Sequence, residues 1–366
     1  MGRPIRRAAV WGVLALALAV AVASVAWAAT PREAGVQAHL LWANVSDAEM
    51  GRQLDQARSA GARVVRVDVG WQTLEERGKG RYTPDYLAKL DRLVAGARHR
   101  ELDLLLTFVF TPCWASTAPD SLRRGCSGDW AGRGVGRYPP RDPGDYASAL
   151  AFLAGRYGDG VRAWEVWNEP NSRAFFNTGD PVGRYSELLG AAYRAVKGAH
   201  AGATVVGGAL SESDAAFADA LYARGARDHM DVLSIHPYSH DRSPLDPLEP
   251  RYASSSFIRG VPAVRQVMLR YGDTRSLWLT ELGWSTSTRR GGAPYDNGVS
   301  KRTQARYLSE AFAQARRWDY VGPVIWYELV DRGGDPADLQ SRFGLRHRGG
   351  PAKPSLEAFR RAAALR

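Results

Sequence analysis

Short apolar runs alternate with longer amphipathic stretches eight times along this chain of 366 residues. The apolar runs predict strands at residues 36–42, 63–69, 102–110, 161–168, 204–210, 231–236, 277–281 and 323–327. The stretches with helical spacing predict helices at residues 46–60, 84–98, 143–156, 182–199, 214–224, 256–270, 301–317 and 354–364. Eight strands, each followed by a helix, predict an α/β fold with a closed parallel barrel, the (β/α)8 or TIM barrel.

The alternative for this alternation is an open doubly wound sheet, which would carry a glycine-rich phosphate turn after its first strand. The sequence at that point, residues 41–44, reads Leu-Trp-Ala-Asn and contains no glycine. Charged residues make up 24% and hydrophobic residues 45% of the chain, which excludes disordered and fibrous classes. No linker or low-complexity tract divides it, so we expect one domain over residues 29–366.

The first 28 residues have the composition of an export signal. Three arginines among the first seven residues precede an uncharged apolar run over 8–25 and then Ala26-Trp27-Ala28. A basic start, an apolar stretch and small residues at the cleavage positions predict a signal peptide over 1–28 and a secreted, extracellular protein. The alternative is an uncleaved membrane anchor, because the apolar run is near the lower length limit for spanning a bilayer.

The net charge of +11 falls to +8 when the three signal arginines are removed. The basic residues are spread along the chain without a basic stripe or recognition motif, so nucleic acid is not an expected partner. No later apolar run has spanning length, so we expect no stable membrane insertion once the signal is cleaved. Histidine and carboxylate spacing shows no zinc-type cluster, and no Walker or dinucleotide glycine pattern occurs, so neither a metal nor another cofactor is expected.

The two cysteines of the chain, Cys113 and Cys126, flank a loop rich in glycine, arginine and serine. In an exported protein this spacing favours a disulfide that closes a surface loop, and closing it contributes about 3 kcal/mol to stability. Two unpaired thiols are the alternative.

Tryptophans occur at five of the eight predicted strand ends, where a barrel places its chemistry. They are Trp42, Trp71, Trp114, Trp284 and Trp326. Indole faces stack on the C–H faces of sugar rings, so five indoles at one rim predict a carbohydrate-binding site. Each of them, taken singly, could instead pack beneath a loop.

A glutamate stands at the tip of the fourth and of the seventh predicted strand. The sequence reads Trp-Asn-Glu-Pro at residues 167–170 and Thr-Glu-Leu-Gly-Trp at residues 280–284. Pro170 disfavours the helical region for Glu169, so we expect that residue to stay extended. A single glutamate at a strand end is normally a solvated loop charge, but Glu169 and Glu281 at the same barrel face predict a pair of carboxylates.

These two motifs resemble the retaining glycoside hydrolases of clan A, and most of all glycoside hydrolase family 39 with its bacterial exopolysaccharide endoglycosidases; family 5 is the neighbour. The resemblance covers nearly the whole mature chain. It includes the segments Val-Arg-Val-Asp at residues 65–68, His-Pro-Tyr at residues 236–238 and Phe-Gly-Leu at residues 343–345. It implies hydrolysis of O-glycosidic bonds in a poly- or oligosaccharide by double displacement, with Glu169 as acid/base and Glu281 as nucleophile.

The resemblance also implies roles for residues around the glutamates. Asn168 is expected to bind the sugar 2-hydroxyl, a contact that strengthens in the transition state, or else to cap its loop. Arg66 lies in an apolar strand, where a charge needs a partner. By resemblance it reaches Glu281, and the alternative is a core ion pair with Glu165, whose side chain shares the inward parity of Glu169; neither reading excludes the other.

Further substrate-binding candidates follow from their positions at strand ends. His236 and Tyr238 are expected to contact the substrate or the nucleophile, and Trp326 is expected to floor the subsite of the sugar that is cleaved. His39 on the first strand is a weaker candidate. Two acidic residues beyond the eighth strand, Glu328 and Asp331, could bind substrate or be loop charges.

Three long loops, 111–142, 237–255 and 285–299, are expected to form the walls of a cleft, which favours endo action. The alternative is that a long loop closes the cleft into a pocket for exo action. The arginines of the first loop could attract an acidic glycan or form a solvated surface; they are Arg123, Arg124, Arg133, Arg137 and Arg141. Two rivals remain beside the hydrolase: a non-catalytic barrel that binds glycan, and a transglycosylase with the same catalytic residues.

Overall fold

The computed structural model describes Gly2 and residues 33–291 and 297–365. Its eight strands form a closed barrel in chain order, every neighbouring pair is parallel, and the first strand pairs with the last. The strands are β1 (Ala34–Gln37), β2 (Val64–Gly70), β3 (Asp103–Val109), β4 (Ala163–Val166), β5 (Thr204–Ser211), β6 (Val232–His236), β7 (Leu277–Leu282) and β8 (Val321–Trp326). The predicted (β/α)8 fold is confirmed.

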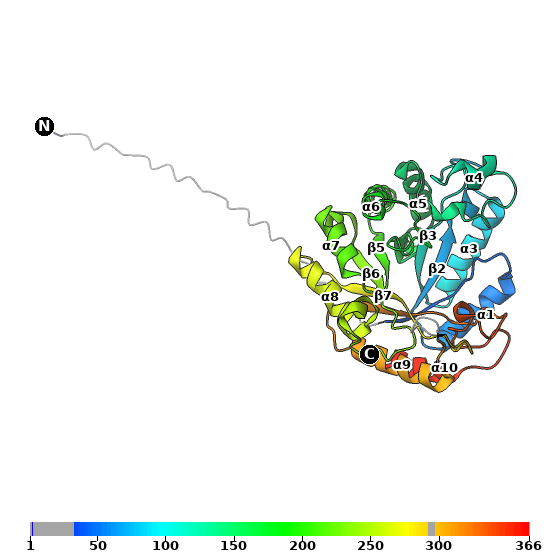
Figure 1. Cartoon of the computed structure of the whole chain (residues 1–366). Helices are drawn as coiled ribbons and strands as arrows, with labels where there is room; N and C mark the ends of the chain where they lie inside the picture. The colour runs from blue at the N-terminus through cyan, green and yellow to red at the C-terminus, as the bar shows by residue number, and fades with distance from the viewer. Residues whose placement is uncertain (1, 3–32, 292–296, 366) are drawn as a thin grey trace.

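The helices lie around the outside of the strands (Figure 1). The long ones are α1 (Asp47–Ser59), α3 (Pro84–His99), α5 (Pro143–Tyr157), α6 (Pro181–Ala199), α7 (Ala215–Ala223), α8 (Phe257–Arg270), α9 (Lys301–Ala315) and α10 (Pro354–Ala364). Two single-turn helices that the sequence pattern did not predict lie in βα-loops, α2 (Trp71–Leu74) and α4 (Asp120–Arg123). Five helix starts are fixed by a side chain that accepts a backbone N–H, which sets where each βα-loop ends; these caps are Ser46, Asp142, Asp180, Asp214 and Ser300.

The barrel interior is built in layers. Its lower layer is apolar and takes one side chain from each of seven strands: Val64, Leu105, Ala163, Val206, Val232, Trp278 and Ile325. Gly35 of β1 leaves room for this layer, because a Cβ there would lie 2.3 Å from Cδ1 of Ile325. Four of these strands carry a polar or charged residue two positions further along, on the same face: Arg66, Thr107, Glu165 and Ser234. A polar layer therefore lies directly beneath the carboxyl ends of the strands.

The predicted signal peptide over residues 1–28 lies, except for Gly2, outside the described residues. Within the part of the chain that the structure describes, no helix is long and apolar enough to cross a membrane.

Candidate active site

The backbone at the end of β4 is left-handed at two residues that are not glycine. The strand ends at Val166, and φ is +69° at Trp167 and +45° at Glu169, so the expected extended conformation of Glu169 is wrong. Pro170 disfavours the right-handed helical region, and the left-handed region is the one this turn adopts. The amide of Glu169 is anchored by a 2.9 Å hydrogen bond to the carbonyl of Ala209. Such residues cost about 1–3 kcal/mol each and concentrate at functional sites.

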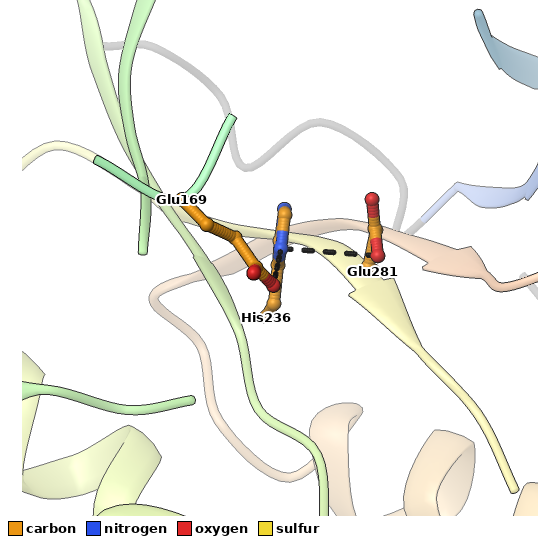
Figure 2. A group of neighbouring side chains, drawn as sticks. All are labelled: Glu169, His236 and Glu281. Atoms are coloured by element: carbon orange, nitrogen blue, oxygen red, sulfur yellow. Dashed lines mark hydrogen bonds and ion pairs between the residues drawn. The ribbon is translucent and has the colours of Figure 1, made fainter. Parts of the chain in front are cut away.

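Glu169 on the β4 end and Glu281 on β7 face each other across the barrel mouth, with His236 of β6 between them (Figure 2). Nδ1 of His236 lies 3.1 Å from Oε1 of Glu169 and 3.8 Å from Oε2 of Glu281. One carboxylate oxygen of each glutamate and one nitrogen of His236 all lie within 4.8 Å of one another. The carboxylate pair expected from the two motifs is therefore present as a geometric unit.

Two hydrogen-bond donors hold the carboxylate of Glu281. The hydroxyl of Tyr238 donates to Oε2 at 2.8 Å, and the guanidinium of Arg66 donates to Oε1. Burial and the nearby charge of Glu281 raise the pKa of Tyr238 well above its ordinary value, so the hydroxyl stays a donor at neutral pH. The two donors fix the orientation of the Glu281 carboxylate, because each holds one of its oxygens.

Arg66 connects Glu281 to the polar layer of the barrel. Its Nε donates to Glu165 at 2.7 Å, and its terminal nitrogens donate to Gln37 at 3.0 Å and to Asn168 at 2.9 Å, besides the bond to Glu281. The two contacts that the sequence left as alternatives, to Glu281 and to Glu165, thus exist together. Burial acts to lower the pKa of Arg66, but Glu165 and Glu281 outweigh it and raise the pKa, so the guanidinium stays charged.

The carboxylate of Glu165 is also fully paired. It accepts hydrogen bonds from Thr107 at 2.8 Å and from Ser234 at 2.9 Å, in addition to the ion pair with Arg66. Burial acts to raise the pKa of Glu165, but the charges of Arg66 and His236 lower it overall. This buried ionic group fixes the guanidinium beneath the barrel mouth.

His236 is fully buried and does not line the cleft, so its place is beside the glutamates rather than against the substrate. Burial acts to lower the pKa of His236, but the charge of Glu281 and the hydrogen bond with Glu169 outweigh burial and raise it. The pKa of His236 therefore depends on the charge of both carboxylates.

A cleft of about 1000 Å³ opens above the pair, at the upper end of the usual range for ligand pockets. The residues that line it at the barrel mouth include Glu169, Glu281, Asn168 and Tyr238. The cleft also extends outward over the β1 and β2 ends to residues that stand outside the barrel, among them Trp42, Ala43, Thr83, Asp85 and Lys89.

A second ionic cluster lies at the ends of β1, β2 and β8, where His39 and Asp68 line the cleft and Glu328 is buried behind them. His39 lies between two carboxylates, with Nδ1 3.3 Å from Asp68 and Nε2 3.0 Å from Glu328. Burial acts to lower the pKa of His39, but Asp68 and Glu328 raise it to about 9. The imidazole stacks on the indole of Trp42, with ring centres 4.2 Å apart and planes at 18°.

Comparison with known sequences decides the family. The family Glycosyl hydrolases family 39 matches residues 144–366, which is more than half of the chain and contains both glutamate motifs. The chain belongs to glycosyl hydrolase family 39. No curated protein matches the sequence.

Solved structures similar to this family 39 chain share its fold. A family 39 glycoside hydrolase from Bacteroides cellulosilyticus WH2 has a TM-score of 0.71 and 24% identity over 92% of this chain and 64% of its own. An exo-β-1,4-mannosidase from Opitutaceae bacterium strain TAV5 has a TM-score of 0.64 and 19% identity over 90% and 59%. A monomeric β-xylosidase from Caulobacter crescentus CB15 has a TM-score of 0.67 and 22% identity over 92% and 68%. The chain spans less than two thirds of the length of the first two.

The family 39 match begins within α5, so it includes β4 to β8 and leaves out the first three strands. Glu169, His236, Tyr238 and Glu281 lie inside the matched segment, whereas Arg66 lies before it. Arg66 nevertheless contacts Glu281, so the barrel unites the two parts of the chain in one site.

Four of the five rim tryptophans do not line the cleft, which corrects the prediction that they contact sugar. Three of them are at most 1% exposed: Trp71, Trp284 and Trp326. Their ring nitrogens are bound inside the loops, to Glu75, to the carbonyl of Arg242 and to the carbonyl of Phe343. Trp114 likewise donates to the carbonyl of Glu75. Only Trp42, with 38% of its surface exposed, lines the cleft.

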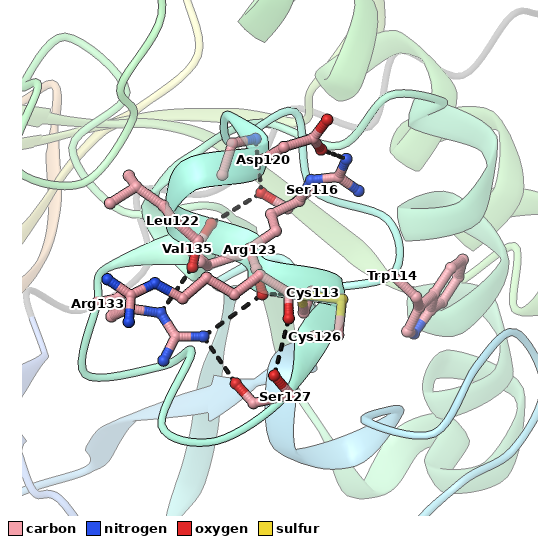
Figure 3. The surroundings of a disulfide bond; sticks show 12 residues. Cys113, Trp114, Ser116, Asp120, Leu122, Arg123, Cys126, Ser127, Arg133 and Val135 are labelled. Atoms are coloured by element: carbon pink, nitrogen blue, oxygen red, sulfur yellow. Dashed lines mark hydrogen bonds and ion pairs between the residues drawn. A yellow bond between two sulfur atoms is a disulfide. The ribbon is translucent and has the colours of Figure 1, made fainter.

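The loop after β3 is closed by the predicted disulfide between Cys113 and Cys126 (Figure 3). Its arginines do not line the described cleft. Arg133 donates to the carbonyls of Leu122 and Ser127, each at 2.7 Å, and thereby braces the loop from within. No residue of 111–142 lines the cleft either, so the expectation that this loop walls the site is wrong.

Glu328 and Asp331, left open as substrate-binding or loop charges, are both about 1% exposed and bonded inside the protein. Glu328 contacts His39, and Asp331 accepts from Lys353 at 2.7 Å.

Several residues that line the cleft were not predicted from the sequence. Asp68 was detectable, because it shares the inward parity of Arg66 at the end of β2. Others lie beyond the ends of the observed strands or in loops and were not predicted as site residues: Phe110, Phe175, Glu212, Tyr327, Arg332 and Phe343.

The spacing of Glu169, His236 and Glu281 is also one that a metal ion could use. Glu281, however, already accepts from the buried guanidinium of Arg66, and a divalent cation there would lie close to that positive charge. The expectation that the protein needs no metal or other cofactor stays a prediction.

Proposed function

We propose that this family 39 protein is a retaining glycoside hydrolase in which Glu169 is the acid/base and Glu281 the nucleophile. The observation that carries the proposal is the separation of the two carboxylates, whose nearest oxygens lie within 4.8 Å. Retaining enzymes keep the two carboxyl groups about 5–5.5 Å apart, whereas inverting enzymes leave about 6.5–9.5 Å for a water molecule. The short separation favours direct attack by Glu281.

In the first step, protonated Glu169 gives its proton to the glycosidic oxygen while an oxygen of Glu281 attacks the anomeric carbon. The bond to the leaving group breaks, and an ester bond to Glu281 forms. Arg66 and Tyr238 hold the carboxylate of Glu281 in one orientation before the attack. The side chain of Asn168 is held by Arg66 at 2.9 Å, in a position to meet the 2-hydroxyl of the reacting sugar.

In the second step, water gives a proton to Glu169 and its oxygen to the anomeric carbon, and the ester bond to Glu281 breaks. The two inversions restore the original configuration. His236 contacts Glu169 at 3.1 Å and remains beside it in both steps, so we assign it to positioning the acid/base.

The charge of the cleft bears on the substrate. Five carboxylates line it, against two permanent cations, Lys89 and Arg332. The loop arginines that could attract an acidic glycan lie elsewhere. We therefore infer a neutral poly- or oligosaccharide, cleaved within the chain because the cleft extends beyond the barrel mouth. The disulfide and the predicted signal peptide support action outside the cell.

The mechanism is tested with two variants. Glu281→Ala should abolish turnover of the polysaccharides that the wild type cleaves, as followed by mass analysis of the products. Azide added to Glu169→Ala should restore cleavage of a dinitrophenyl glycoside and give a glycosyl azide of retained configuration, as read by NMR. Inverted product contradicts the mechanism. A wild type that binds glycans without turnover supports the non-catalytic barrel, and products longer than the starting sugar support transglycosylation.

A further inference from the structure

The cleft is not symmetric about the catalytic pair. The carboxyl group of Glu169 turns toward His236 on β6, whereas the side chain of Asn168 turns toward Arg66 on β2. Because the acid/base protonates the leaving group, the β5–β6 side receives the leaving group. The sugar whose 2-hydroxyl meets Asn168 then lies on the side of β1, β2 and β8. This orientation rests on the proposed function.

On the β1–β2 side the cleft continues past the barrel mouth. Thr83, Asp85 and Lys89 belong to the start of α3 and the residue before it, in the outer layer of helices. A pocket for a single sugar bound against Glu169 and Glu281 has no need of walls from that outer layer. The cleft thus offers space for a second sugar beyond the one that reacts.

Trp42 is the side chain that would meet this second sugar. Among the described residues, the exposed large hydrophobic side chains are Trp42 and three leucines, and of these only Trp42 lines the cleft. Exposing the apolar face of an indole to water is unfavourable, and a sugar ring that stacks on the indole removes this exposure. The carboxylate of Asp85, which also lines the cleft, can accept hydrogen bonds from sugar hydroxyls.

Trp42 is also held in place before any ligand arrives. Nζ of Lys89 donates to the carbonyls of Trp42 and Val45, each at 2.7 Å. The ring of His39 stacks on the indole, and the guanidinium of Arg332 lies 5.3 Å from the ring centre. A preorganised aromatic surface loses less conformational entropy on binding than a mobile one.

We propose that Trp42 builds a second glycone subsite, so that the preferred donor carries at least two neutral sugar units on the non-reducing side of the cleaved bond. Trp42 lies outside the segment that the family match covers, so this subsite belongs to the part of the chain where the match gives no information. The subsite makes the glycone length a determinant of catalytic efficiency.

The test compares 4-nitrophenyl β-glycosides of one and of two sugar units, in the xylose and mannose series. Three proteins are assayed: wild type, Trp42→Ala and Leu269→Ala. Leu269 is a matched control, because it is 42% exposed on α8 and does not line the cleft. The ratio of kcat/KM for the two-unit donor to kcat/KM for the one-unit donor should fall about tenfold in Trp42→Ala, the size of a lost stacking contact. It should not change in Leu269→Ala.

The proposal is overturned if wild type shows no preference for the two-unit donor, or if Trp42→Ala lowers both values of kcat/KM equally. Absence of turnover with every donor and with every polysaccharide contradicts the proposed glycosidase, and the subsite is then tested by calorimetry. Xylotriose and mannotriose are then titrated into Glu169→Gln with and without Trp42→Ala. Affinity that depends on Trp42 supports the subsite in a glycan-binding protein, and equal affinity of the two proteins, or no binding, overturns it.

Discussion

The hydroxyl of Tyr238 donates a 2.8 Å hydrogen bond to Oε2 of Glu281, so a residue two positions beyond β6 orients the carboxylate that ends β7. The other oxygen of that carboxylate is bound by Arg66. With both oxygens held, the carboxylate of Glu281 is fixed in one orientation, as its proposed role as nucleophile requires. Tyr238 is 43 positions from Glu281 in the chain, and only the closure of the barrel brings the two together.

Replacing Tyr238 by Phe removes this donor and keeps the ring. We expect kcat/KM to fall about 10- to 100-fold, because a hydrogen bond to a charged group contributes about 1.5–3 kcal/mol. Steady-state kinetics on a cleaved glycoside measure the loss, and thermal unfolding should show a fold as stable as wild type within about 1 kcal/mol. An unaltered kcat/KM would mean that Arg66 alone orients the nucleophile.

Arg66 supports both the fold and the site. Arg66→Met leaves Glu165 buried without its cation, and we expect a loss of about 3–5 kcal/mol in the free energy of unfolding, measured by urea denaturation. Adding Glu165→Gln should recover part of this stability, because it removes the uncompensated charge. Activity should stay low in both variants, since Glu281 still lacks its partner. Recovery of activity in the double variant would contradict a direct role of Arg66 at Glu281.

Much of this architecture follows from sequence periodicity. Alternating apolar runs and amphipathic stretches determine the barrel, and residue parity along β2 and β4 places Arg66 and Glu165 inside it. The two glutamates were predictable because each ends a strand in a distinctive motif. The ionic connection from Glu165 through Arg66 to Glu281 was predictable only as two alternatives, because pairing between strands far apart in sequence depends on the closed barrel.

The rim tryptophans show a limit of prediction from the sequence. A strand-end position locates the Cα but not the direction of the side chain. Trp71 begins α2, and its buried indole donates to Glu75 at the end of the same helix, whereas Trp42 stays at the surface of the cleft. The left-handed turn at Glu169 was missed for a related reason, since Pro170 excludes one backbone region without choosing among the others.

The disulfide between Cys113 and Cys126 is expected to stabilise the loop after β3 without serving the chemistry. Replacing both cysteines by serine should lower the free energy of unfolding by about 3 kcal/mol, the chain-entropy value for a loop of this length. Because no residue of 111–142 lines the cleft, kcat and KM of the folded variant should stay within about twofold of wild type at low temperature. Denaturation curves and kinetics of the same preparation measure both quantities. A large change in KM with intact stability would show that the loop contacts substrate after all.

The pH dependence of stability is expected to arise at the cluster of His39 and Glu328. The folded state raises the pKa of His39 to about 9 because Asp68 and Glu328 outweigh burial, so its stabilisation is complete below about pH 6.5 and is lost as pH rises through about 9. Burial, partly offset by His39, raises the pKa of Glu328 to about 7, so ionising that carboxyl costs stability as pH rises from about 4.5 to 7. Both groups act with the same sign.

The free energy of unfolding should therefore decrease by about 3 kcal/mol between pH 6 and pH 9. This figure is smaller than the sum of the two pKa shifts, because His39 and Glu328 interact with each other and the same interaction contributes to both shifts. Urea denaturation across this range measures the slope. His39→Asn alone would let the pKa of Glu328 rise further, because the hydrogen bond and the charge of His39 lower it. The double variant His39→Asn with Glu328→Gln removes both titrating groups, so its slope should be shallower than that of wild type across this range. A wild-type curve that is flat from pH 6 to pH 9, or a double-variant curve with the wild-type slope, would contradict the assignment of the pH dependence to this cluster.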